Sequence, residues 1–520
     1  MSNPVFLQLL WLKYYQNKVK KIVFHDRFGI LLVMFSDGTE QQCKVLYVKS
    51  QSRKEREECK MSARKNRRIV LIGICILLVV CTGVLVAFAQ QGKVVSSYGP
   101  INQDLTFDQI KTMRMSVKAE RLQEHMKLLN SRYDLSNRTS PDINMSGGKP
   151  IPVGPTAKLQ AVTWEQLDKM TPEQIKEQGL FPYKPLPFAD HAEGGMLFPE
   201  MITKLLPRLV RFDLDFDLPE HILPDPAPAI YLTTRPDLGD VSKGQLITID
   251  NYYEIFNGLL NPKQLEGLRL LVTQFPQQQF NATEDRRTDR PSLGVTCFDC
   301  HANGHSNGAN HLVGDIRPQE FRHRIDTPTL RGVNVQRLFG SQRALKTVED
   351  FTEFEQRAAY FDGDHCMAAK KGVNVLERGS QVHFMAEFMA LLDFPPAPKL
   401  NIYGELDPEK ATPGELRGEM LFNGKARCNA CHAAPYYTDN SMHDLKAERF
   451  YKQEMVNGMM MAHDGAIKTF PLRGIKDSPP YLHDGRCFTL EDTVEYFNLI
   501  QQLHLTDQEK KDIVDFMRSL

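Results

Sequence analysis

The sequence predicts a mainly α-helical protein with a single transmembrane helix, a proline-rich mixed region and a duplicated C-terminal half. Three observations carry this prediction. Residues 69–88 contain no charged side chain and are long enough, at helical rise, to cross a bilayer. Prolines are frequent from Phe181 to about Ile249, where the pattern indicates short strands and turns. The segment Cys297–His301 recurs as Cys428–His432, each time after a predicted helix.

Both copies of the repeated segment read Cys-x-x-Cys-His, and their chemistry-bearing residues are Cys297, Cys300, His301, Cys428, Cys431 and His432. Two thiols at this spacing can bond to the vinyl groups of a haem while the adjacent histidine ligates the iron on its proximal side. A single copy also fits a redox dithiol or half of a zinc site. Because the motif occurs twice with similar flanks, the sequence predicts two covalently bound haem c groups in two cytochrome c-like domains.

Length and charge set the outline of the chain. A chain of 520 residues is too long for one core, and its 64 basic and 64 acidic side chains leave no net charge to attract nucleic acid. We predict a short cytosolic segment, an anchor or signal segment, an extracytoplasmic mixed α/β accessory region, and a first and a second cytochrome c-like haem domain. In chain order these are residues 1–60, 61–90, 91–258, 259–395 and 396–520.

Basic side chains crowd the N-terminal side of the apolar run at residues 69–88. They are Arg53, Lys54, Arg56, Lys60, Arg64, Lys65, Arg67 and Arg68. The positive-inside rule then places the N-terminus in the cytoplasm and everything after Gln90 outside it. We therefore expect an inner-membrane anchor with both haem domains in the periplasm.

A second interpretation of the same region stays open. From Met61 the chain has the layout of a secretory signal, with a small-x-small site at Ala87–Ala89, so export after signal cleavage is the alternative. On this interpretation translation starts at Met61 and residues 1–60 are not translated. If they are translated, residues 20–24 and 29–39 predict a small β-hairpin.

Helices after residue 90 are predicted from apolar periodicity and from capping residues. Pro262 fits the first turn of one helix, and Thr412-Pro-Gly-Glu opens another as a capping box. The predicted helices are 107–129, 163–179, 261–271, 347–360, 375–392, the segment from Thr412, 489–497 and 506–520. Each haem motif is followed by a Leu-Arg-Gly element, at Pro328–Gly332 and Pro471–Gly474. Because the two elements are not identically spaced, we expect a duplication with drift.

The second half also resembles a known family. The stretches Gly418–His432, Lys468–Gly474, Pro480–Arg486 and Thr489–Asn498 are similar to the bacterial di-haem cytochrome c peroxidase and MauG superfamily. The resemblance covers about residues 259–520. It implies two α-helical cytochrome c-like domains that face each other. One haem would accept electrons from a small donor, and the other would react with hydrogen peroxide.

The resemblance also implies roles for single residues. His301 and His432 match the proximal iron ligands, and Arg331 and Arg473 match arginines that can pair with haem propionates. His483 matches a histidine near the second haem. Asp326, Ser478 and Pro480 match positions that hold a calcium ion between the domains.

Several positions depart from the family pattern, and no catalytic residue is assigned. Residues 339–343 read Phe-Gly-Ser-Gln-Arg where peroxidases have Phe-Trp-Asp-Gly-Arg, and the tryptophans of the chain are Trp11 and Trp164. The bridging tryptophan between the haem groups is therefore missing. Phe497 replaces the methionine or tyrosine that caps the second iron, and phenylalanine cannot ligate iron. The acidic residues of the peroxide pocket have only out-of-register counterparts, namely Glu349, Glu353 and Glu355.

Candidates for the distal iron ligands follow each motif. Met455, Met459, Met460, Met461 and His463 form a cluster beyond the second motif, and His305, His311 and His323 follow the first. We single out His311, His323 and Met459. The alternatives are surface histidines and methionines that fill a core. Cys366 and Cys487 fit either a disulfide or two buried thiols.

The expected function is that of an extracytoplasmic di-haem c-type cytochrome, a peroxidase-like oxidoreductase. It would pass electrons between a donor and hydrogen peroxide or another acceptor. The alternative is non-catalytic electron transfer, with residues 91–258 docking to a respiratory partner. Expected partners are a small cytochrome or cupredoxin, or a respiratory complex, together with the membrane through one helix. Nucleic acid is not expected, and homodimer formation is left open.

Overall fold

The computed structural model divides the chain into two units, Met1–Val94 and Val95–Leu520, which are described separately. The described residues are 19–25, 30–36, 41–47, 107–186, 196–210, 218–276, 294–311, 325–355, 378–453, 455–456, 459–460 and 464–520. Residues 69–88, the predicted membrane span, lie outside these ranges, as does the predicted cleavage site.

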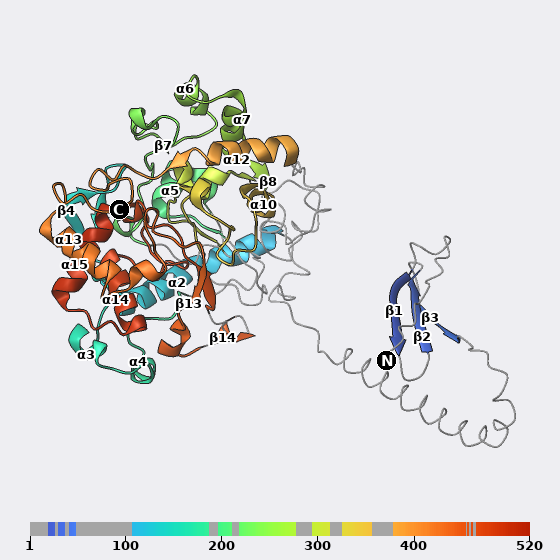
Figure 1. Ribbon diagram of the computed structural model, residues 1–520, viewed down its shortest axis with the longest axis horizontal. Helices are drawn as coiled ribbons and strands as arrows, with labels where there is room; N and C mark the ends of the chain where they lie inside the picture. Colours follow the sequence, from blue (N-terminus) through green and yellow to red (C-terminus); the bar gives the residue numbers. More distant parts are fainter. Residues whose placement is uncertain are drawn as a thin grey trace, which may run out of the picture. The chain divides into compact units, whose positions relative to one another are not determined.

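The first unit contains an antiparallel sheet in the order β1-β2-β3 (Figure 1). Its strands are β1 (Val19–His25), β2 (Ile30–Ser36) and β3 (Gln41–Tyr47). Runs of β-branched and aromatic residues favour extended backbone at these positions. The sequence pattern predicts β1 and β2 but not β3.

In the second unit the helices are α2 (Phe107–Arg132), α3 (Trp164–Asp168), α4 (Pro172–Gln178), α5 (Glu200–Leu205), α6 (Tyr252–Phe256), α7 (Pro262–Leu271), α9 (Cys297–Cys300), α10 (Val348–Phe354), α12 (His383–Met389), α13 (Pro413–Asn423), α14 (Leu490–Gln501) and α15 (Asp507–Ser519). The strands are β4 (Thr139–Asn144), β5 (Pro150–Pro152), β6 (Met196–Leu197), β7 (Tyr231–Leu232), β8 (Phe275–Pro276), β9 (Gly294–Val295), β10 (Asn310–His311), β11 (Ile325–Asp326), β12 (Leu392–Asp393), β13 (Met442–Asp444), β14 (Met455–Val456), β15 (Met459–Met460) and β16 (Ala466–Lys468). The strands form small ladders, among them β11-β10-β6, β12-β7 and β13-β16.

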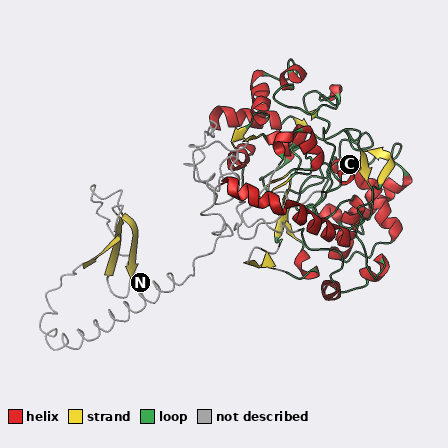
Figure 2. Cartoon of the chain, turned by 180° about the vertical axis from the view of Figure 1, so that it is seen from behind, coloured by secondary structure: helices red, strands yellow, loops and turns green. Residues whose placement is uncertain are grey.

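The predicted mainly α-helical fold class is wrong. Less than half of the described residues are helical, and long loops with short strand pairs connect the helices, so the class is mixed helix and strand (Figure 2). Within the described ranges, no helix is both long enough and apolar enough to cross a membrane. The prediction erred because strands of two or three residues are formed by pairing with distant segments, which local periodicity does not reveal.

The duplicated halves share the same helix-on-helix contact. The helices α7 and α13 both begin with a capping box and a proline, through Asn261 and Thr412. Each has a glycine at its sixth position, and at this glycine the helix packs closely against another helix. A Cβ on Gly267 would lie 1.9 Å from the carbonyl oxygen of Phe384 on α12. A Cβ on Gly418 would likewise lie 1.9 Å from the oxygen of Asp512 on α15. Only glycine permits this approach.

The repeat is in constant register from the Leu-Arg-Gly elements onward. Gly332 and Gly474 both have left-handed backbone, with φ of 71° and 72°, and each precedes a short 3₁₀ turn. A single β-bridge follows in each half, between Phe339 and Leu345 and between Tyr481 and Cys487. The caps Thr347 and Thr489 then open α10 and α14. The drift expected from the Leu-Arg-Gly elements therefore lies upstream, between each motif and its strand.

Two hydrophobic cores hold the second unit together. The larger one joins Leu129, Ile175 and Phe181 to the second haem half, for example to Phe488 and Tyr496. Buried polar bonds reinforce this core. The Tyr133 hydroxyl donates to the carbonyl oxygen of Arg486 over 2.9 Å, and the Thr156 hydroxyl donates to Asp492 over 2.7 Å.

The second core joins the later part of the accessory region to the first haem half. Ile230, Leu232 and Ile247 pack with α7 and α12 in this core. The described accessory residues are thus shared between the two cores, while the predicted boundaries at 258 and 395 stay predictions.

Candidate haem-binding site

One cavity of about 660 Å³ is lined by both Cys-x-x-Cys-His motifs. This volume lies in the usual range for ligand sites, and most of the lining is apolar, as a haem requires. The first motif forms α9, which Thr296 and Asp299 cap reciprocally. Arg208, which lies outside the motif, forms a bidentate ion pair with the Asp299 carboxylate at 2.6 and 2.7 Å. The second motif occupies a 3₁₀ turn at Cys428–Ala430.

The two motif histidines are oriented alike. The Nδ1 atom of His301 lies 2.9 Å from the carbonyl oxygen of Pro328, and the Nδ1 atom of His432 lies 2.9 Å from that of Tyr437. A carbonyl oxygen only accepts, so each Nδ1 carries the proton and each Nε2 has a lone pair for a metal. Burial lowers the pKa of His301 to about 4 and lowers that of His432 as well. Both rings are therefore neutral, which is the form that ligates iron.

The motif cysteines are available for thioether bonds. None of the four forms a disulfide. Burial raises the pKa of Cys297 and of Cys428 to about 12, and it also raises the pKa of Cys431. Such thiols stay protonated at neutral pH, which does not favour a thiolate zinc site or a reactive dithiol. Paired thiols, a neutral histidine and an apolar cavity together fit haem c.

The two Leu-Arg-Gly arginines have different surroundings. Arg473 lines the cavity, stacks on Phe394 at 5.7 Å and donates from Nε to the oxygen of Leu520 over 3.0 Å. Among the described residues it has no hydrogen bond to an acidic side chain, so its guanidinium fits a haem propionate. Arg331 instead donates to Asp477 over 2.7 Å and to the oxygen of Ala229 over 2.6 Å. The structure thus gives Arg331 a protein carboxylate as its partner.

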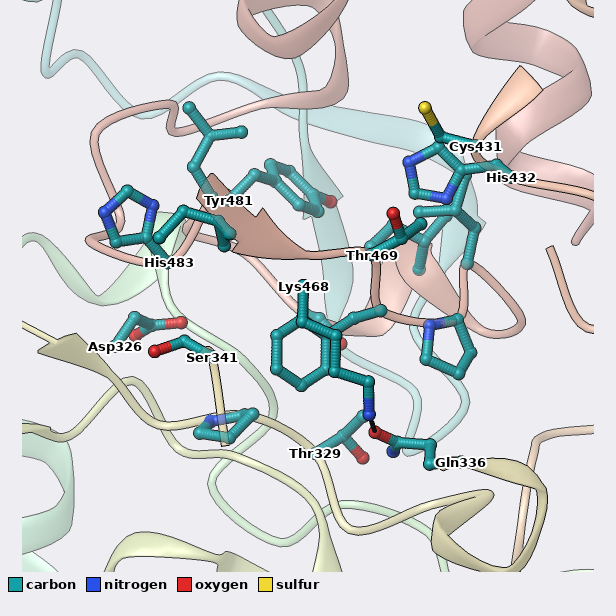
Figure 3. A pocket seen from close by; sticks show the side chains of 18 of the residues that line it. Asp326, Thr329, Gln336, Ser341, Cys431, His432, Lys468, Thr469, Tyr481 and His483 are labelled. Carbon is teal, nitrogen blue, oxygen red and sulfur yellow. Dashed lines mark hydrogen bonds between the residues drawn. The ribbon is translucent and has the colours of Figure 1, made fainter. Parts of the chain in front are cut away.

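The positions matched to a calcium site lie along one stretch of the cavity wall. Asp326, Ser478 and Pro480 line it together with His483, and the backbone N–H of Asp326 donates to the oxygen of His483 over 3.0 Å. Figure 3 shows Asp326 and His483 on the cavity wall. The described part of the chain contains no group of three His, Cys, Asp or Glu side chains placed to hold a metal ion. The calcium ion stays a prediction.

For most of the candidate distal ligands the structure does not describe the side chain. His323 and His463 lie outside the described residues, and for His311 on β10 and Met459 on β15 only the strand is described. His305 is buried, with Nδ1 2.7 Å from the Thr329 hydroxyl and Nε2 2.9 Å from the oxygen of Asp477. Both its ring nitrogens are thus engaged by protein. Cys487 is a buried free thiol, while Cys366 lies outside the described residues.

The register of the repeat reveals a site residue that the sequence analysis left unplaced. Glu355 lies as far beyond the cap Thr347 as Phe497 lies beyond the cap Thr489, and both side chains line the cavity. Glu355 is also close enough to raise the pKa of Cys297, after the larger effect of burial. The matching Thr-x-Glu-Asp caps were the available sequence signal.

Comparison with known proteins also points to haem proteins. No family model matches the chain. It is 31% identical over 118 residues to the methylamine utilization protein MauG of Methylorubrum extorquens, covering 20% of this chain and 33% of that protein. It is 28% identical over 147 residues to the cytochrome-c peroxidase IdrP1 of Denitromonas iodatirespirans, covering 20% of this chain and 39% of that one. It is 30% identical over 132 residues to the cytochrome c551 peroxidase of Nitrosomonas europaea, covering 24% of this chain and 39% of that protein.

The matches span only about a third to two-fifths of the length of these relatives. MauG proteins and cytochrome c peroxidases from several organisms nevertheless match the chain in this way. This chain is therefore similar, over part of its length, to MauG and to the cytochrome c peroxidases.

Proposed function

We propose that this protein is an extracytoplasmic di-haem c-type cytochrome that reduces hydrogen peroxide with electrons from a donor protein. The observation that carries the proposal is that both motifs line one cavity with their histidines neutral and turned alike. When bound, haem c supplies iron that exchanges single electrons. Each hydrogen peroxide takes up two electrons and two protons and leaves as two water molecules.

The duplicated halves present different side chains to the cavity at one equivalent position. In the first half this side chain is the Glu355 carboxylate, and in the second it is the Phe497 ring. A carboxylate can hold and release a proton beside bound peroxide, whereas a phenyl ring can neither transfer a proton nor ligate iron. We assign peroxide reduction to the side of Cys297–His301 and electron entry to the side of Cys428–His432.

The electron donor belongs to the proposal in the same way. A small cytochrome or a cupredoxin fits the role, because either carries one electron at a time. A respiratory complex is the other candidate donor. The placement outside the cytoplasm rests on the need to export the chain for haem attachment at Cys-x-x-Cys-His motifs.

The test is steady-state peroxide reduction by the holoprotein with a reduced small cytochrome c as donor. The Glu355→Gln variant should lower kcat/KM for peroxide by about 10²–10⁴-fold, since it removes the proton-handling group. Glu353→Gln is the matched control on the same helix. Glu353 pairs with Arg378 at 2.7 Å and does not line the cavity, so its loss should change the rate only a few-fold.

Electron paramagnetic resonance of the oxidised protein provides the decisive outcome. A high-spin signal that changes on addition of peroxide supports the enzyme. Two low-spin centres that do not respond to peroxide would contradict it and leave non-catalytic electron transfer as the function.

A further inference from the structure

Two equivalent positions of the repeat carry opposite charges. The sequence Ile325-Asp326-Thr327 aligns with Ile467-Lys468-Thr469 in the register that relates the Leu-Arg-Gly elements, and each charged residue ends its strand, β11 or β16. Both Asp326 and Lys468 line the cavity that contains the two haem motifs. The scaffold is thus repeated while the charge is reversed.

The backbone around these two residues is symmetric across the boundary between the halves. The N–H of Lys468 donates to the carbonyl oxygen of Ser341 over 2.9 Å, and the N–H of Asp326 donates to that of His483 over 3.0 Å. Ser341 and His483 are themselves equivalent in the repeat. Each strand therefore bonds to the loop of the opposite half, so the backbone at both charged residues is held where the two halves meet.

The ammonium group of Lys468 is an unusual cavity lining. The side chain is 3% exposed, and Nζ donates to Oε1 of Gln336 over 2.9 Å (Figure 3). The rings of Phe339 and Phe470 lie 5.6 and 5.2 Å from Nζ. Among the described residues no carboxylate is hydrogen-bonded to it. Burial lowers its pKa to about 8, with the Arg343 guanidinium as the second cause, so the cation still predominates at pH 7.

A fixed charge in such a place acts on the redox equilibrium of a nearby centre. Inside a protein the Coulomb interaction is several times stronger than in water. A cation favours the reduced state, which carries one more electron, and a carboxylate favours the oxidised state. Local charge and burial are among the factors that set the potential of a protein-bound iron centre.

We propose that the charges of Lys468 and Asp326 hold the reduction potentials of the two haem groups apart. Lys468 raises a potential, and Asp326 lowers one. This inference rests on the proposed function in one respect, namely that both motifs carry haem. A difference between the two potentials gives electron flow a direction in a duplicated protein that has no bridging tryptophan.

The test is a potentiometric titration of the full-length holoprotein, followed by haem absorbance in a buffer with a divalent-cation chelator. Lys468→Met should lower at least one midpoint potential by about 59 mV, which corresponds to a tenfold change in the equilibrium constant for one-electron reduction. Asp326→Asn should raise at least one midpoint potential. Lys468→Arg, which keeps the charge, should stay near the wild-type values.

Surface substitutions on α15 serve as matched controls. Lys511→Met and Asp515→Asn remove the same charges from a pair on the exposed face, where Lys511 is 66% exposed, and should leave both potentials unchanged. If Lys468→Met does not fold, Lys468→Gln is titrated in its place, because it keeps a polar end near Gln336.

Unchanged potentials in folded Lys468 and Asp326 variants that retain two haem groups would overturn the inference, even if their thermal stability falls. That result would assign both residues a structural role. A wild-type protein without two haem groups would instead refute the proposed function itself.

Discussion

At the residue scale, a buried ion pair joins the two haem halves. Arg331 of the first half and Asp477 of the second are each 3% exposed and lie 2.7 Å apart. Asp477 also accepts the backbone N–H of Ser146 over 2.9 Å, which brings in the accessory region. Burial is the largest single effect and opposes ionisation of Asp477, but the charges of Arg331 and His305 and the hydrogen bonds from Ser146 and Arg331 together outweigh it, so the pKa lies below its ordinary 3.8. This carboxylate is therefore a junction of three segments.

Replacing Asp477 with asparagine should lower the free energy of unfolding by about 3–5 kcal/mol at pH 7, because it leaves a buried guanidinium without its counter-ion. The folded-state pKa of Asp477 is depressed, so its contribution is present above pH 3.8 and is lost as pH falls through the lower folded-state value. Denaturant unfolding at pH 7 and below pH 3.8 measures both effects. The difference between wild type and variant should shrink in acid.

Asp515→Asn is the control for that measurement. Its near partner Lys511 is exposed and its other partner, Arg518, lies 3.7 Å away, so the loss should be within about 1 kcal/mol. An Asp477→Asn protein as stable as this control would contradict the buried-pair account.

The same residues show where sequence reasoning stopped. The Leu-Arg-Gly elements were found, and Arg473 lines the cavity, while its pairing with a propionate stays a prediction. Arg331 was matched to a propionate because its partner Asp477 lies far along the chain and has no local signal. The buried contacts of His305 were missed for the same reason.

At the element scale, the capped helices were predictable and the strands were not. Asn261, Thr412, Thr489 and Thr506 all accept from the third residue of their helices, as their local sequences indicated. A cap is written in four adjacent residues. A ladder such as β13-β16 is fixed by residues more than twenty positions apart, so local patterns miss it.

Gly418→Ala should destabilise the second haem half strongly, by about 3 kcal/mol, because the new methyl group meets backbone rather than a movable side chain. Gly414→Ala lies on the same helix, where a Cβ would be in ordinary contact at 3.4 Å. That variant should be neutral or gain up to about 1 kcal/mol from helix propensity. Thermal unfolding of both variants decides the matter, and equal melting temperatures would exclude the close contact of α13 with α15.

At the scale of the whole molecule, the accessory region is part of the cores. The sequence pattern there showed turns and prolines, and it suggested a separate docking module. Its apolar residues are instead divided between the two haem halves, as Leu129 and Ile230 illustrate. Composition gave no sign of this division, because it depends on which distant surface each apolar side chain covers.

A chain shortened to residues 259–520 should therefore fail to fold, although it keeps both motifs. Removing Leu129, Ile175 and Phe181 would expose the apolar side chains that they cover in the larger core. Circular dichroism and haem content after export would show the loss. A soluble, cooperative two-haem fragment would mean that the accessory region is dispensable.

The central claim is that each Cys-x-x-Cys-His motif holds one haem c in a shared cavity. Intact-mass spectrometry of the exported protein, together with a pyridine haemochrome assay, tests it most directly. The account predicts a mass increase of two covalently bound haem groups, and of one in a variant with Cys428 and Cys431 both replaced by alanine. A chain without added haem mass, or one whose haem content is unchanged in that variant, would contradict it.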